Sequence, residues 1–175
     1  MKKPIIRVPL KYAFFGGILA FSVLLILFYF GNSHPQLLPI FMDFRIILFG
    51  LFIFFSIKEF KEVENGGTLH FWQGMAVGII CYVGISWLAS LGIMGLGKVD
   101  EAYVQGYVNE MTTVLTDNEA AVREKVGDEA YDAQVEALPS TTIFALAFDY
   151  FLKSMFIGLF LTIIISVILR KQPKN

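Results

Sequence analysis

"AFFGGILAFSVLLILFYF", residues 13–30, is a run of 18 residues without a charge. A helix that crosses a lipid bilayer needs about 20 mostly apolar residues. Because the run follows the basic segment "MKKPIIRVPLK", a cleaved secretory signal peptide is the alternative interpretation. Signal cores are about 7–15 residues long and end at small residues, whereas this run is longer and ends in "FYF". We therefore predict a membrane-spanning helix that is retained.

Three more segments have the length and composition of membrane helices: residues 37–57, 71–96 and 143–169. The 175-residue chain is 56% hydrophobic and only 17% charged, against roughly 25% charge in soluble domains. The net charge of -1 argues against nucleic acid as a partner. The fold class we predict is all-α: an integral membrane protein with four transmembrane helices in contact with the lipid bilayer.

Basic residues are distributed unevenly between the two sides of such a four-span chain. Nine fall on one side: Lys2, Lys3, Arg7, Lys11, Lys58, Lys61, Arg170, Lys171 and Lys174. Three fall on the other: Lys98, Arg123 and Lys125. Cytoplasmic connections carry the excess of Lys and Arg. We therefore expect both termini, and the loop between the second and third helices, to be cytoplasmic.

The segment 98–141, between the third and fourth spans, is the one part with soluble character, and it holds ten of the fifteen acidic residues. Its first part has an apolar stripe at helical spacing, formed by Val104, Val108, Met111 and Leu115. "TDNE", residues 116–119, has the pattern of a capping box that opens a second helix, which Gly127 would close. A third helix would place Tyr131, Val135 and Leu138 on one face and end at Pro139. We predict a helical, acidic extramembrane cap.

Four charged residues lie inside the predicted spans. Asp43 and Arg45 are two positions apart, which places them on nearly opposite sides of a helix, so they are not expected to pair. Asp149 and Lys153 are four apart, the spacing of an ion pair on one face. At about 1.5 Å per residue, Asp43 and Asp149 each lie about 9 Å along their spans, within the outer third of the bilayer.

Three interpretations of these charges remain open. Arg45 and Lys153 can extend to the headgroups while the acids lie at the interface. Alternatively, Arg45 pairs with Asp149, or Asp43 with Lys153, and joins the second and fourth spans. In the third interpretation the four residues line an ion or proton path, since ionisable residues inside a membrane are candidate functional groups. Against the third, the sequence places no charge deeper in any span.

Small residues recur every four positions in three spans, which lets helices approach closely. They are Gly16 and Ala20 in the first span, Gly74 and Gly78 in the third, and Gly158, Thr162 and Ser166 in the fourth. They either pack the chain into one four-helix bundle or form a homodimer face.

No motif of catalysis, phosphate binding or metal binding is present in the sequence. His34 and His70 fall on opposite sides of the predicted membrane, so they cannot share a metal ion. The single Cys81 is expected to be a buried apolar residue. We expect no cofactor and no enzymatic activity.

Residues 58–78, "KEFKEVENGGTLHFWQGMAVG", join a charged connection, a glycine pair and a polar–aromatic run that enters the third span. With the four spans, the acidic segment before the last span and the tail "ISVILRK", this layout resembles the bacterial membrane protein family called domain of unknown function 4199. The resemblance covers nearly the whole chain. It implies an integral protein of the bacterial cytoplasmic (inner) membrane and supplies no activity or catalytic residues.

Two classes of function fit these features. The first is a scaffold or partner-binding membrane component that presents the acidic cap to a membrane or periplasmic protein. The alternative is a small transporter or channel, acting as a homo-oligomer, with Asp43, Arg45, Asp149 and Lys153 around an outer vestibule. A proline that breaks a span would favour the alternative, but Pro35 and Pro39 lie where the second span begins.

Overall fold

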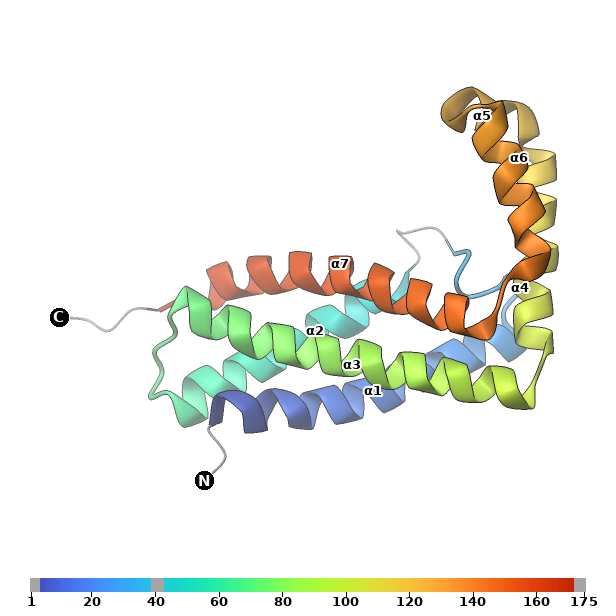
Figure 1. The fold of residues 1–175 in the computed structure, drawn as a ribbon. Helices are drawn as coiled ribbons and strands as arrows, with labels where there is room; N and C mark the ends of the chain where they lie inside the picture. Colours follow the sequence, from blue (N-terminus) through green and yellow to red (C-terminus); the bar gives the residue numbers. More distant parts are fainter. Residues whose placement is uncertain (1–3, 39–42, 172–175) are drawn as a thin grey trace.

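The computed structural model describes residues 4–38 and 43–171, and these residues form helices and no strand (Figure 1). Three helices are long and apolar enough to cross a membrane: α1 (Pro4–Phe30), α3 (Phe71–Val99) and α7 (Ile143–Leu169). The prediction of an all-α protein is therefore confirmed, with three helices among the described residues that have the length and composition to span a membrane.

The helix in the second predicted segment is shorter than expected. α2 (Phe44–Glu59) has 16 residues and continues into a π-helical turn, η2 (Phe60–Glu64). The prediction that this helix begins at residue 37 is wrong, because Leu37 lies in a turn and Asp43 is the N-cap. Residues 39–42 lie outside the described residues. The Asp43 carboxylate accepts a hydrogen bond from the backbone N–H of Arg45, which satisfies a free donor in the first helical turn.

α1, α2, α3 and α7 pack against one another (Figure 1). Contact sites on α1 and α3 advance together, from Ala13 against Gly84 to Phe21 against Gly92, so these two helices run in parallel. α3 and α7 run antiparallel. α2 returns toward the start of α1, where Lys11 forms an ion pair with Glu59 at 2.6 Å. The start of α1, the end of α7 and the η2–α3 connection consequently lie at one end, which we call the terminal end.

The small residues of α3 and α7 face each other inside the chain. Gly74 packs on Ser166, Gly78 on Thr162 and Gly158 on Tyr82. A Cβ atom at any of these glycines would collide with its neighbour, so the close approach of the two helices depends on them. In α1, Gly16 packs on Ile85 of α3, and Ala20 is fully buried. The stripes therefore serve packing between helices of one chain.

Three shorter helices and a turn follow α3: α4 (Ala102–Asp117), α5 (Glu119–Val126), α6 (Asp128–Ala137) and the 3-10 turn η3 (Leu138–Ser140). We call residues 102–140 the arm. Figure 1 shows the arm projecting across the direction of the long helices, at the end opposite the start of α1, which we call the arm end. Leu115, Tyr131 and Leu138 form a small core inside it.

The sequence predicted some details of the arm correctly. Gly127 ends α5 with φ at 87°, a backbone conformation that favours glycine. The capping box at 116–119 is wrong, because the Thr116 hydroxyl donates to the Thr112 carbonyl and Asn118, the N-cap of α5, makes no side-chain cap bond. Thr116 lies within α4 and back-bonds along that helix instead.

Candidate functional site

Polar side chains gather where the start of α2 meets α7 and the base of the arm. We call this group the junction cluster; its members are His34, Gln36, Asp43, Arg45, Tyr103, Tyr150 and Ser154. Six of the seven are less than one-tenth exposed, namely His34, Gln36, Arg45, Tyr103, Tyr150 and Ser154. Such burial is costly for polar groups unless they find partners.

Arg45 is the charged centre of the junction cluster and is only 7% exposed. Its Nε donates to both carboxylate oxygens of Asp43 at 2.8 Å, and its Nη2 also donates to Asp43. The expectation that Asp43 and Arg45 cannot pair is wrong. Asp43 lies before the helix in an extended conformation, so helical spacing does not govern the direction of its side chain.

The remaining donor of Arg45 joins α2 to α7. Nη1 donates to the Tyr150 carbonyl and to the Ser154 hydroxyl, at 3.3 Å each. The guanidinium also lies 4.9 Å from the centre of the Tyr150 ring, a cation–π distance. Neither Arg45–Asp149 nor Asp43–Lys153 forms an ion pair in the described part of the chain. The two helices are thus joined by Arg45 and neutral groups of α7.

Asp149 and Lys153 pair with each other on α7, as their spacing predicted, with 2.7 Å between Lys153 Nζ and Asp149 Oδ2. This pair is about half exposed, unlike the buried Asp43–Arg45 pair. Lys153 and Arg45 line one pocket of about 300 Å³ together with Asp43 and Gln36. Asp149 lines a different pocket, between α7 and the arm. The structure thus brings three of the four predicted charged residues into one cavity.

His34 anchors the connection between α1 and α2 to the base of the arm. Its backbone N–H donates to Glu110 of α4 at 2.6 Å. Its ring centre lies 4.6 Å from that of Tyr103, 5.4 Å from that of Tyr107 and 6.0 Å from that of Phe28. Burial lowers the pKa of His34 to about 4, an effect that outweighs the nearby Glu110 carboxylate. His34 is therefore neutral at pH 7.

Sequence reasoning missed His34, Gln36 and Tyr103 as members of the cluster. Gln36 Nε2 donates to the Leu146 carbonyl of α7 at 3.1 Å, and Tyr103 is fully buried. Burial raises the pKa of the Tyr103 phenol. One signal was present: Tyr103 and Tyr107 are four apart and so share a helix face. Val104 and Val108 have the same spacing on a neighbouring face, and the sequence does not show which of the two faces is buried.

The far part of the arm presents acidic side chains to the surroundings. Residues 102–140 include eight acidic and two basic residues. Arg123 pairs with Glu119 at 2.7 Å, Asp128 at 3.1 Å and Asp132 at 2.7 Å. Glu124, Glu129 and Glu136 are exposed. Within the described ranges, no group of three or more His, Cys, Asp or Glu side chains is placed to hold a metal ion.

The family model described as "Protein of unknown function (DUF4199)" matches residues 11–171, almost the whole chain. No curated protein matches the chain. No solved structure matches it either.

Proposed function

Because the chain belongs to the DUF4199 family, whose function is unknown, its role has to be argued from its own residues, and we propose a non-enzymatic, partner-binding subunit of the bacterial cytoplasmic membrane. In this proposal α1, α2, α3 and α7 form a four-helix transmembrane bundle. The arm is the part that another protein recognises, on the periplasmic side.

The parallel course of α1 and α3 supports four spans. If both helices cross the membrane in the same direction, the chain has to return between them, and α2 is the helix that lies there. α2 and η2 together supply 21 residues, about 30 Å if each residue rises about 1.5 Å, close to the hydrocarbon thickness of a bilayer. The basic connections then fall at the terminal end and the acidic arm at the other, which the positive-inside rule favours.

The observation that carries the proposal is that the arm is a preformed helical surface fixed at its base. Tyr103, near the start of α4, is fully buried in the same core as the long helices. Beyond that base the arm has its own small core, and its acidic side chains point away from it. A fixed surface loses less conformational entropy on binding than a flexible loop does. Its charge favours a partner with a basic face.

The test neutralises exposed acids far from the buried base. In the variant Glu124→Gln/Glu129→Gln, neither residue belongs to the Arg123 ion-pair network or to a hydrophobic core. The matched control is Glu62→Gln/Glu64→Gln, which removes the same charge from exposed positions at the terminal end. Native mass spectrometry after mild extraction should show a co-purifying protein with the wild type and the control, and much less of it with the arm variant. Equal recovery from both variants contradicts the proposal.

A second candidate, a small oligomeric transporter, is favoured by one observation. The N-terminus of α2 lies level with Tyr150 and Ser154, seven and eleven residues after α7 begins, or about 10–17 Å along it. If α7 spans the membrane, α2 begins inside the bilayer beside a charged pocket, as in the interrupted helices of transporters. This candidate predicts that Asp43→Asn and Asp149→Asn abolish solute flux in proteoliposomes while the folded protein is retained. Unchanged flux in both variants rules it out.

A further inference from the structure

We propose that the pocket between the start of α2 and the middle of α7 binds a phospholipid from the leaflet on the arm side, with Lys153 and Arg45 holding its phosphate. The inference requires that the long helices cross a membrane, and it is independent of any protein partner. The pocket has a volume of about 300 Å³, enough for a headgroup fragment but not for a whole lipid.

Lys153 and Arg45 each have N–H donors beyond those that their protein partners use. A Lys ammonium has three donors, and the ion pair with Asp149 accounts for one of those of Lys153. Arg45 has five N–H groups, and its bonds to Asp43, Tyr150 and Ser154 account for four. Gln36 adds an amide group to the same wall. Charge-assisted bonds to phosphate oxygens are among the stronger hydrogen bonds in proteins.

The net charge of the pocket also suits an anion. Asp43 neutralises Arg45, so the charge left in the pocket is that of Lys153. The partner of Lys153, Asp149, lines a separate pocket and is 39% exposed. Because a Lys ammonium has three donors, Lys153 can bind a phosphate oxygen while it stays paired with Asp149.

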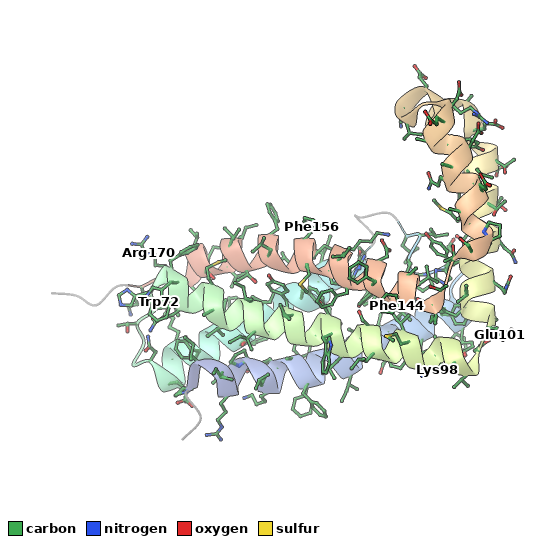
Figure 2. All side chains as sticks on the ribbon, in the orientation of Figure 1. Trp72, Lys98, Glu101, Phe144, Phe156 and Arg170 are labelled. Atoms are coloured by element: carbon green, nitrogen blue, oxygen red, sulfur yellow. The ribbon has the colours of Figure 1, made fainter. Side chains whose placement is uncertain are left out.

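Apolar walls make an amphiphile a better ligand than a soluble anion. Phe156 and Ile157 line the pocket next to Lys153, and Phe156 is 76% exposed. Figure 2 shows Phe156 projecting outward from α7, away from the other long helices. In a spanning α7 this side chain contacts acyl chains. An inorganic phosphate ion would leave these walls unused, whereas a phospholipid places its headgroup against the charges and a chain along Phe156.

The side chain of Lys153 extends toward the headgroups on the arm side. Side chains of a helix lean toward its N-terminus, and the N-terminus of α7 is at the arm end. Lys153 accordingly reaches back to Asp149, four residues or about 6 Å nearer that end. Long basic side chains inside a membrane extend in this way toward the headgroups.

The experiment compares Lys153→Met with Lys98→Met by native mass spectrometry of protein extracted in mild detergent. Lys98, near the end of α3, is exposed at the same end of the molecule and does not line the pocket (Figure 2). The wild type and Lys98→Met should each retain one phospholipid. Lys153→Met should retain about tenfold less, the effect of losing one charge-assisted contact. Equal retention by the two variants overturns the proposal.

Two further measurements keep the inference testable. If Lys153→Met does not fold, amine-reactive labelling of the wild type replaces it: added phospholipid should protect Lys153 and leave Lys98 unchanged, and equal labelling overturns the proposal. A large excess of inorganic phosphate should not displace the lipid. Displacement by phosphate alone would assign the pocket to a soluble anion and overturn the phospholipid assignment.

Discussion

Arg45 and Asp43 are stabilised mainly by each other, because both are removed from solvent. Deleting one member of such a pair leaves a buried charge without its partner and costs about 3–5 kcal/mol, whereas replacing both is often close to neutral. We therefore expect Arg45→Met to lower the free energy of unfolding by about 3 kcal/mol. Asn is as good an N-cap as Asp, so the double variant Asp43→Asn/Arg45→Met should recover most of that loss. Reversible unfolding in mixed micelles, followed by circular dichroism, measures both.

The control for these two variants is Lys11→Met, which breaks the partly exposed ion pair between Lys11 and Glu59. Exposed pairs contribute about 0–1 kcal/mol, so this variant should unfold almost like the wild type. If the double variant is as unstable as Arg45→Met alone, the ion pair is not what stabilises the junction between α2 and α7.

His34 makes the attachment of the arm dependent on pH. Burial lowers its pKa from 6.5 to about 4. Between these values an unfolded chain binds a proton that the folded chain does not, so stability is complete above pH 6.5 and falls as the pH drops toward 4. The loss is at most about 1.4 kcal/mol per pH unit. We expect the apparent melting temperature of the wild type to fall between pH 7 and pH 5.

His34→Phe removes the titrating group and keeps an aromatic ring in the same cluster. Its melting temperature should change less over this pH range than that of the wild type. His70→Phe is the matched control, because the side chain of His70 is exposed at the terminal end, and it should keep the wild-type response. If the melting temperatures of all three proteins fell equally over this pH range, titratable groups other than His34 would cause the pH dependence.

Among the helices, the α3–α7 contact is the one most sensitive to side-chain size. Gly78 packs directly on Thr162, so Gly78→Val inserts atoms where the two helices touch. Overpacking typically costs 1–3 kcal/mol, and we expect a loss of about that size in unfolding experiments. Gly50 is the control: nothing lies within 4 Å of a Cβ added there, and helices favour Ala over Gly, so Gly50→Ala should be neutral or stabilising. Equal effects of the two substitutions would mean that α3 and α7 do not meet at Gly78.

The three helices that are long and apolar enough to cross a membrane were predictable, because continuous apolar character decides them. α1, α3 and α7 contain the predicted segments 13–30, 71–96 and 143–169: α1 begins nine residues earlier, α3 ends three residues later, and α7 has the predicted bounds. The start of α2 was not predictable in this way, since residues 37–43 are nearly as apolar as the helix. Asp43 did carry a local signal, an N-cap residue before an apolar run, but hydropathy averaged over the segment hides a single cap.

The junction cluster was largely beyond prediction from sequence, because it joins residues far apart in the chain. His34 belongs to the connection after α1, Tyr103 to α4 and Tyr150 to α7. Helical spacing relates residues within one element, so it found the Asp149–Lys153 pair. It contains no information on which carbonyl or hydroxyl of another helix Arg45 meets. Those contacts follow from how α2 and α7 pack.

At the scale of the whole molecule, the arm end and the terminal end differ in charge. Figure 2 shows Arg170 at the terminal end, and Lys98 and Glu101 where the arm begins. Eight acidic residues belong to the arm, whereas the terminal end carries the basic residues around α1, η2 and the end of α7. Such asymmetry fixes the direction in which a membrane protein inserts. The proposed partner surface belongs to the arm, whereas the proposed lipid pocket is lined by residues of α2, α7 and the connection before α2.

The topology can be tested with single-cysteine variants in a Cys81→Ala background, since Cys81 is buried. Asn32, Glu62 and Glu124 are exposed residues of the α1–α2 connection, η2 and the arm. In spheroplasts, a membrane-impermeant maleimide should label Asn32→Cys and Glu124→Cys, and should reach Glu62→Cys only after lysis. The comparison of Asn32→Cys with Glu62→Cys tests whether α2 crosses the bilayer, because only then do the two positions lie on opposite sides of the membrane. Labelling of both in spheroplasts would mean that α2 does not cross, and α1 and α3 could not then cross in the same direction.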